Sequence, residues 1–170
     1  MLMLFRHAKA VSGTGEQLDE ERGLTPGGAE DARKAGETLR RLKLAPSLVL
    51  CSTARRTRET LQGLEQGIGK PLNKEFIPRL YLTPSGEVLW QIQRAPESVR
   101  SLMVIGHNPA LHELCRALAG QGEEDALEAL ALKFPPAALA ILRFSARPWA
   151  RIAPGEGELE TLMLPARSAA

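Results

Sequence analysis

The sequence predicts a three-layer α/β/α domain with a mostly parallel central sheet, because apolar strand-like runs alternate with amphipathic helix-like segments. Three short runs, at residues 2–5, 47–51 and 102–105, are hydrophobic throughout apart from Ser47. This pattern is typical of parallel strands that helices cover on both faces. The length of 170 residues fits one domain spanning 1–170, in which 166–170 are expected to be a frayed tail.

The first two helices follow the first two strand regions. Thr25 suits an N-cap and Pro26 the first helical position, so a helix is expected to run from there to about Leu42. A second helix is expected to begin near Ser52, with its apolar residues on one stripe. Both would pack against the predicted sheet.

A later helix has start and stop signals of its own. Asn108 is expected to be its N-cap, Pro109 its first residue, and Gly120 to lie just past its end. The late part of the chain is expected to add some antiparallel pairing. The remaining elements are predicted as short helices at about 85–94 and 123–132, and as strands at 138–144, 149–152 and 159–164.

Composition limits the classes of function. The 22 basic and 20 acidic residues give a net charge of +2, which is too balanced to indicate a nucleic-acid or membrane partner. The opening apolar run is five residues long and is followed by Arg6, unlike a signal peptide. Cys51 and Cys115 have no metal-ligand spacing and are expected to be small buried residues in a reducing compartment. The sequence therefore predicts a cytoplasmic protein.

Histidine and arginine residues follow three of the predicted strands. Arg6 and His7 come after the first, Arg56 after the second, and His107 after the run at 102–105. Because ligand sites in open α/β sheets lie beyond the carboxyl ends of the strands, parallel pairing would bring these side chains into one crevice. Guanidinium groups bind phosphate oxygens, and a neutral imidazole is a competent nucleophile, so the crevice suits phosphoryl transfer.

These segments resemble a known family in sequence order. Residues 6–8 resemble the Arg-His-Gly signature of the histidine phosphatase superfamily, also called phosphoglycerate-mutase-like. Residues 52–60 resemble its Ser-Pro-x-x-Arg-Ala-x-Gln-Thr element, and 104–109 its Gly-His element. Residues 22–28 are similar to an Arg-Pro-Leu-Thr-x-x-Gly stretch. The resemblance extends over about residues 2–144, and the short chain points to the small SixA-type phosphohistidine phosphatases.

The resemblance implies a phosphoglycerate-mutase-like fold and a phosphatase that forms a covalent phosphohistidine on His7. It implies that Arg6, Arg56 and His107 hold the phosphoryl oxygens, and that neither a metal nor another cofactor takes part. Arg56 is preferred to Arg55 because it has the family's spacing and shares a predicted helix face with Ser52 and Thr60. The implied substrate is phosphohistidine in a protein.

Other readings stay open. One alternative is that the substrate is a small phosphomonoester or sugar phosphate, with the protein acting as a phosphatase or mutase. A more distant alternative is a phosphate-binding module without catalysis on the same fold. Mutase-like members use a glutamate as general acid, and Glu87 is a candidate here. A phosphohistidine leaves as an imidazole and needs less help from an acid than an alkoxide does.

Several other residues are expected to have ordinary structural roles. His112 is expected on a helix surface and Arg55 on a solvated helix face. Asp19, with the acidic residues that follow it, is expected to lie in a mobile acidic loop. Trp90 and Trp149 are expected to pack in the core or at its rim.

Overall fold

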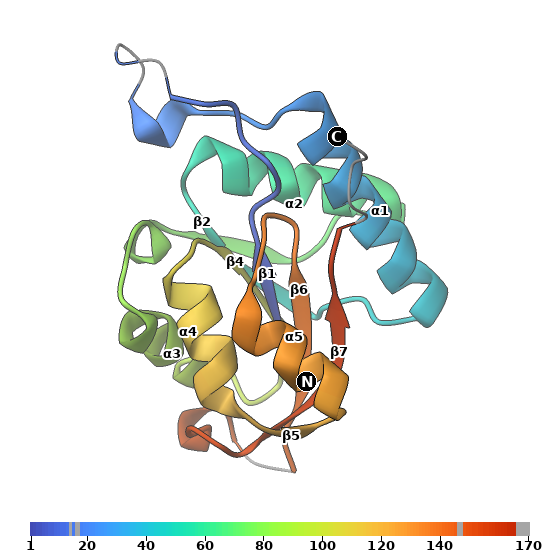
Figure 1. Cartoon of the computed structure of the whole chain (residues 1–170), viewed down its shortest axis with the longest axis vertical. Helices are drawn as coiled ribbons and strands as arrows, with labels where there is room; N and C mark the ends of the chain where they lie inside the picture. Colours follow the sequence, from blue (N-terminus) through green and yellow to red (C-terminus); the bar gives the residue numbers. More distant parts are fainter. Residues whose placement is uncertain (14, 16–17, 146–147, 166–170) are drawn as a thin grey trace.

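The computed structural model describes residues 1–13, 15, 18–145 and 148–165, so the expected tail at 166–170 lies outside the described residues. The elements are, in chain order, β1 (Leu2–Arg6), η1 (Asp19–Glu21), α1 (Pro26–Leu42), β2 (Leu48–Ser52), α2 (Arg55–Ile68), β3 (Lys74–Ile77), η2 (Pro78–Leu80), α3 (Ser85–Gln93), β4 (Leu102–Gly106), α4 (Ala110–Leu118), β5 (Ala119–Gly122), α5 (Glu124–Leu132), β6 (Leu139–Arg143), η3 (Trp149–Arg151) and β7 (Gly157–Met163). Helices flank one sheet, as predicted (Figure 1).

The sheet has seven strands among the described residues, in the order β3-β2-β4-β1-β6-β7-β5. β4 pairs in parallel with β1 on one side and with β2 on the other, and β2 pairs in parallel with β3. The late strands supply the expected antiparallel pairs, β1 with β6 and β6 with β7. The carboxyl ends of β1, β2 and β4 therefore meet at one edge of the sheet, at the top of Figure 1.

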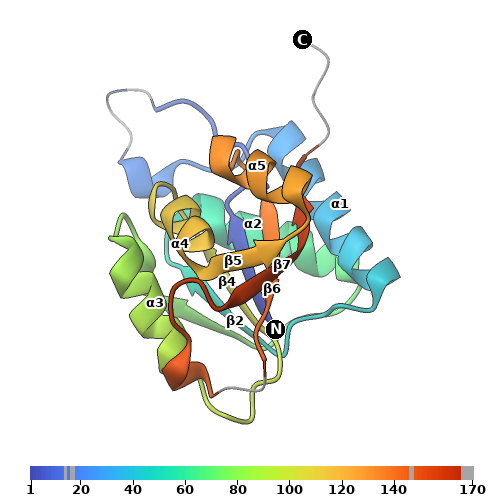
Figure 2. The same cartoon turned by 60° about the horizontal axis from the view of Figure 1, so that its bottom comes forward.

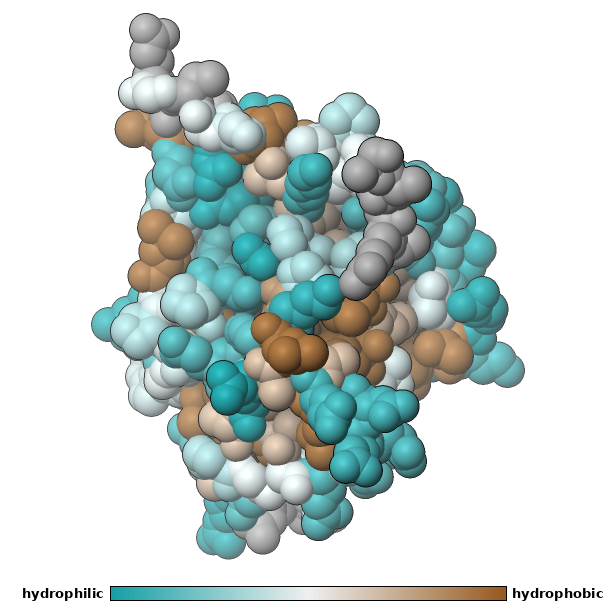
Figure 3. Space-filling view, in the orientation of Figure 1, coloured by the Kyte–Doolittle hydropathy of each residue, from teal (hydrophilic) through white to brown (hydrophobic). Residues whose placement is uncertain are grey.

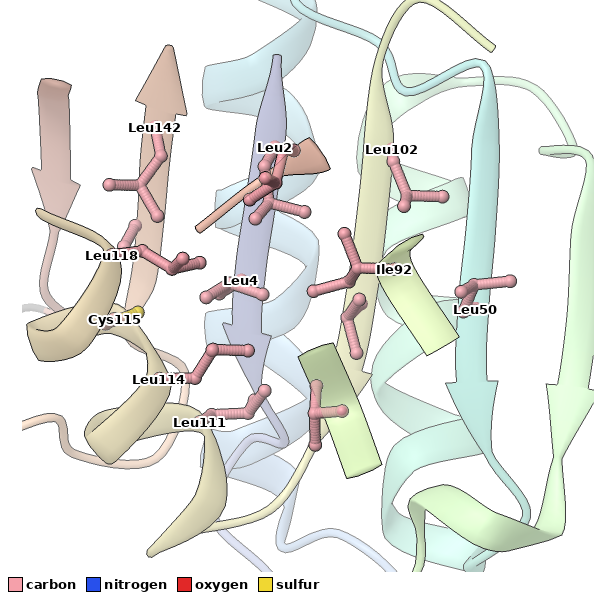
Figure 4. Close-up of a cluster of buried hydrophobic side chains, with 14 of the residues drawn as sticks. Leu2, Leu4, Leu50, Ile92, Leu102, Leu111, Leu114, Cys115, Leu118 and Leu142 are labelled. Carbon is pink, nitrogen blue, oxygen red and sulfur yellow. The ribbon is translucent and has the colours of Figure 1, made fainter. Parts of the chain in front are cut away.

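Alternate side chains of the strands enter two separate cores. Leu2 and Leu4 of β1 face α3 and α4, where they meet Ile92 and Leu111 (Figure 4). Their neighbours Met3 and Phe5 point the other way, toward α1 and α2, which lie behind the sheet in Figure 4. Each face buries its own apolar set because side chains alternate along a strand. Figure 2 shows the same layers from a second direction.

The helices α1 and α2 pack at close range through glycines. A Cβ atom at Gly67 would lie 2.0 Å from the backbone oxygen of Arg33, and one at Gly36 would lie 2.3 Å from that of Leu64. The start of α1 is as predicted, because the Thr25 side chain accepts a hydrogen bond of 3.0 Å from the backbone N–H of Gly28. This packing supports the edge of the sheet that carries the site.

One late expectation is wrong. Residues 149–152, predicted as a strand, form the 3₁₀ helix η3, in which the buried Trp149 ring donates a hydrogen bond of 2.8 Å to the Val99 carbonyl. Gly120 lies just past the end of α4, as expected, and it also belongs to β5, which pairs with β7. The strands β3 and β5 were not predicted from the sequence.

Two helix starts also differ from the prediction. Ser52 closes β2, where it is in register with Ile77, so α2 begins only at Arg55. α4 begins at Ala110, and Asn108 does not cap it. The Asn108 amide instead donates a hydrogen bond of 2.8 Å to the Phe134 carbonyl, which holds that side chain away from the helix end.

The face of the molecule in Figure 3 is largely hydrophilic, and its hydrophobic residues gather mainly in the middle and toward the right of the view. Within the described ranges, no helix combines the length and apolar character needed to cross a membrane. Cys51 and Cys115 are both buried, as expected, and neither forms a disulfide.

Candidate active site

The carboxyl end of β1 is held on both sides by backbone hydrogen bonds. The His7 N–H donates to the Gly106 carbonyl at 3.0 Å, and the His7 carbonyl accepts from the Ala137 N–H at 3.1 Å. The Ala8 N–H donates to the Thr60 hydroxyl of α2 at 3.0 Å. Backbone hydrogen bonds to neighbouring segments therefore fix the position of His7, independently of any contact made by its side chain.

The His7 ring has one nitrogen assigned by its partner. Its Nδ1 lies 2.8 Å from the Ala8 carbonyl, which can only accept a hydrogen bond, so Nδ1 carries the proton. The other nitrogen, Nε2, then holds a lone pair. Burial, with Arg56 and Arg6 close by, lowers the pKa of His7 to about 4. The ring is therefore neutral near pH 7.

The His107 ring lies beside that of His7, with 5.2 Å between the ring centroids. His107 follows β4, and its Nε2 is 2.8 Å from the hydroxyl of Ser52 at the end of β2. Burial lowers the pKa of His107 to about 3, with smaller contributions from His7 and Arg56. When the Ser52 hydroxyl donates to Nε2, Nδ1 of this neutral ring carries a proton and can donate it.

Two arginines complete the set that the sequence predicted, and the structure places both at the same edge of the sheet. Arg6 donates a hydrogen bond of 2.9 Å to the Phe134 carbonyl. Arg56, at the start of α2, is 2% exposed. Three buried nitrogens have no hydrogen-bond partner among the described residues: Arg6 Nε, Arg56 Nε and His107 Nδ1. Buried donors are nearly always paired, so these three are available to an acceptor such as an oxyanion.

Asp19 belongs to this site, contrary to its expected place in a mobile acidic loop. It lies in η1, where its carboxylate accepts hydrogen bonds of 2.9 Å from Arg56 Nη2 and 2.6 Å from the Tyr81 hydroxyl. Arg22 binds its other oxygen. Hydrogen bonds from Tyr81, Arg22 and Arg56 hold the pKa of Asp19 far below its usual value, so the carboxylate stays ionised.

Sequence reasoning missed Tyr81 as well as Asp19. Tyr81 is the one tyrosine of the chain, and its ring lies edge-on to that of His107, with 5.5 Å between centroids. The Arg56 guanidinium lies over the same ring. A signal was present for Asp19, which precedes Arg22 by three residues, a spacing that favours an ion pair. Nothing in the local sequence singled out Tyr81.

The other candidates lie elsewhere. Glu87 accepts a hydrogen bond of 2.9 Å from Gln91 and lies 3.7 Å from Arg79, so it is not joined to the four predicted site residues. His112 lies on α4 and is half-buried rather than fully on the surface. Its Nε2 donates a hydrogen bond to the Leu130 carbonyl, and its ring stacks on that of Phe134. Among the residues described, no cluster of three or more acidic, histidine or cysteine side chains is arranged to hold a metal ion.

Comparisons with known proteins show which family the chain belongs to. The model of the histidine phosphatase superfamily (branch 1) matches residues 2–80. An uncharacterized protein of Mycobacterium tuberculosis is 38% identical over 152 residues, which is 88% of this chain and 92% of the relative.

Two solved structures are similar over nearly their whole length. A protein of Agrobacterium tumefaciens assigned as the phosphohistidine phosphatase SixA is 30% identical, with a TM-score of 0.81, over 96% of this chain and 97% of that one. A protein of Nakamurella multipartitia with the same assignment is 30% identical, with a TM-score of 0.83, over 96% and 95%. The chain belongs to the histidine phosphatase superfamily, with a SixA-type likeness, and is a phosphatase.

Proposed function

We propose that this phosphatase hydrolyses phosphohistidine in proteins through a covalent intermediate on His7, without a metal. The observation that carries the proposal is the set of three buried donors without a partner, on Arg6, Arg56 and His107, beside a neutral imidazole. Fixed donors in a buried site stabilise a phosphoryl group during transfer. The similarity to two proteins assigned as SixA supports the choice of phosphohistidine.

In the first step, His7 Nε2 attacks the phosphorus atom. The new P–N bond forms as the bond from phosphorus to the leaving nitrogen breaks, and the electron pair of the broken bond stays with the leaving group. The Ala8 carbonyl keeps Nδ1 protonated, so the lone pair is on the nitrogen that reacts. Arg6, Arg56 and His107 donate hydrogen bonds to the phosphoryl oxygens.

In the second step, water attacks the phosphorus of phospho-His7. The P–N bond breaks, its electron pair returns to Nε2, and inorganic phosphate leaves with the oxygen of the water. Because Nδ1 still carries its proton, the ring departs as a neutral imidazole rather than as an anion. Guanidinium groups supply the positive charge that a divalent cation supplies in other phosphoryl-transfer enzymes.

The test is the His7→Ala variant, assayed on a phosphohistidine protein and on p-nitrophenyl phosphate in the presence of EDTA. We expect kcat/KM to fall by at least about 10³-fold, as when other nucleophiles are removed. The wild-type protein, quenched in acid-free denaturant after a pulse of ³²P substrate, should carry acid-labile label on His7. Full turnover by His7→Ala would refute the proposal.

The same assays separate the alternatives. A phosphatase or mutase for a small phosphomonoester or sugar phosphate would show a higher kcat/KM for that metabolite than for the phosphohistidine protein. A binding module would bind phosphate or tungstate with no turnover at all. For the proposed function we expect turnover, with the highest kcat/KM on the phosphohistidine protein.

A further inference from the structure

A cavity lies beside the proposed phosphoryl site and shares His107 with it. Its volume is about 370 Å³, and it lies between the segment after η2, α3 and the start of α4. Most of its walls are apolar, including Leu80, Val88 and Leu111. Because His107 both lines this cavity and lies beside the His7 ring, we place the leaving group of a bound phosphoryl compound in this space.

The polar groups of this cavity are mainly hydrogen-bond acceptors. Glu113, in the first turn of α4, lines it and is exposed, and its carboxylate makes no hydrogen bond or ion pair with the described residues. Asn108 also lines it, and its Oδ1 is buried without a partner in the described part of the chain. Thr83 adds a hydroxyl, which can accept or donate. An apolar space with two free acceptors fits a flat, largely apolar group that carries an N–H donor.

We propose that this cavity binds the leaving group and that the Glu113 carboxylate accepts a hydrogen bond from the distal ring N–H of an N-phosphorylated imidazole. This inference rests on the proposed function and adds the residue that recognises the leaving ring. Glu113 is not the general acid for which the sequence had suggested Glu87, since its carboxylate accepts a hydrogen bond from a proton that the leaving ring already carries. The site becomes donor-rich around the phosphoryl oxygens and acceptor-rich around the ring.

The chemistry of transfer explains why an acceptor is needed there. The bond between phosphorus and the substrate ring nitrogen breaks as the bond to His7 Nε2 forms, and the electron pair stays on the leaving ring. When the distal nitrogen of that ring holds a proton, the ring leaves as neutral imidazole. Glu113 would hold that N–H on the substrate as the Ala8 carbonyl holds Nδ1 of His7. In each of the two rings that exchange the phosphoryl group, the nitrogen that does not react then keeps its proton through a hydrogen bond to an acceptor.

The same lining disfavours a sugar phosphate. A sugar presents several hydroxyl groups, each of which loses water on binding and needs a partner to replace it. The walls contributed by Leu80, Leu82, Pro84 and Val88 offer none from their side chains. An imidazole ring needs one partner for its N–H, and a carboxylate also favours the protonated form of the ring.

The experiment compares Glu113→Gln with the wild-type protein on two substrates, phosphoimidazole and p-nitrophenyl phosphate. Nitrophenolate leaves without a proton, so its release does not depend on Glu113. We expect kcat/KM for phosphoimidazole to fall about 10- to 100-fold in the variant, and kcat/KM for p-nitrophenyl phosphate to stay within about threefold. Glu87→Gln is the matched control, since it removes a carboxylate from the adjacent helix α3, and should change neither value.

A pH profile gives a readout that a merely structural role would not change. His107 and Glu113 are the titratable groups that line the cavity; Arg116 lies further along α4 and Glu87 on α3. With phosphoimidazole, the alkaline fall in kcat/KM should begin about one pH unit lower in Glu113→Gln than in the wild type, because the ring loses its proton more easily.

Equal losses on both substrates, or no loss on phosphoimidazole, would overturn the role of Glu113 while the proposed function stands. The labelling of His7 by p-nitrophenyl phosphate distinguishes a failure of the Glu113 role from a failure of the proposed function. If that substrate labels His7 in the wild type and in Glu113→Gln, the His7 chemistry is intact and any selective loss belongs to the leaving group. If His7 is never labelled, the proposed function is wrong and this inference falls with it.

Discussion

Stability should fall steeply between pH 7 and pH 5 because two site histidines are kept neutral in the folded protein. An unfolded histidine has a pKa of about 6.5, whereas the pKa of His7 is about 4 and that of His107 about 3. Between these values the unfolded chain binds protons that the folded chain does not. The contribution of each ring to the free energy of unfolding is thus fully present above the unfolded pKa, and it is lost as the pH falls toward the folded pKa.

The size of the effect follows from these pKa values. At pH 5 the difference between folded and unfolded protonation amounts to about 2 kcal/mol for each histidine, relative to pH 7. The two rings together should lower the free energy of unfolding by about 4 kcal/mol. Asp19 contributes little in this interval, because an unfolded aspartate has a pKa of about 3.9 and the effect of its low folded pKa begins only below that.

The measurement is urea unfolding at pH 7 and at pH 5, in buffers without phosphate, for the wild-type protein and His7→Gln. Removing one ring should reduce the pH-dependent loss by about 2 kcal/mol, since glutamine does not titrate. Other carboxylates that titrate near pH 5 affect both proteins equally and cancel in the comparison. The same loss in both proteins would show that His7 is not kept neutral by its surroundings, and the argument for its nucleophilic form would fail.

Two further substitutions test the packing and the rim of the site. Gly67→Ala should lower the free energy of unfolding by about 2 kcal/mol or more, because its Cβ would lie 2.0 Å from the backbone oxygen of Arg33. Gly86→Ala is the control and should not destabilise the protein, because nothing lies within 4 Å of its Cβ. Asp19→Asn should lower the free energy of unfolding by about 1 kcal/mol. The value is small because the Asp19 carboxylate is 42% exposed, although its partner Arg56 is buried. Urea unfolding at pH 7 measures both, and an unchanged midpoint would contradict either expectation.

The strands that could be predicted from the sequence are those that a run of apolar side chains identifies. β1, β2 and β4 are continuous apolar runs, and each was placed correctly from the sequence. β5 has the sequence Ala-Gly-Gln-Gly, with no apolar pattern, and exists because its backbone pairs with β7. β3 lies at the edge of the sheet, where Glu75 and Phe76 are both exposed, so it too lacks the pattern of a buried strand.

The site was predictable to the extent that it depends on strand ends. His7, Arg56 and His107 follow parallel strands, and the sheet brings them together. Asp19 and Tyr81 reach the same place from η1 and from the segment after η2, whose positions depend on contacts distant in sequence. An acidic segment that looks solvated in the sequence thus supplies the counter-ion of a buried arginine. Likewise, only the position of the cavity distinguishes Glu113 from Glu87.

The charges around the crevice explain why a neutral histidine and a carboxylate belong in the same phosphate site. Arg56 is almost fully buried, and an unpaired buried charge is costly, so Asp19 compensates it from the more exposed side. That contact uses Nη1 and Nη2 and leaves Nε for a ligand. Arg22 and Arg56 bind the Asp19 carboxylate, and Arg6 does not. The three guanidinium groups and the one carboxylate together leave two positive charges for a phosphoryl dianion. Because neither histidine titrates near pH 7, this balance is set by residues of fixed charge, and the nucleophile keeps its lone pair.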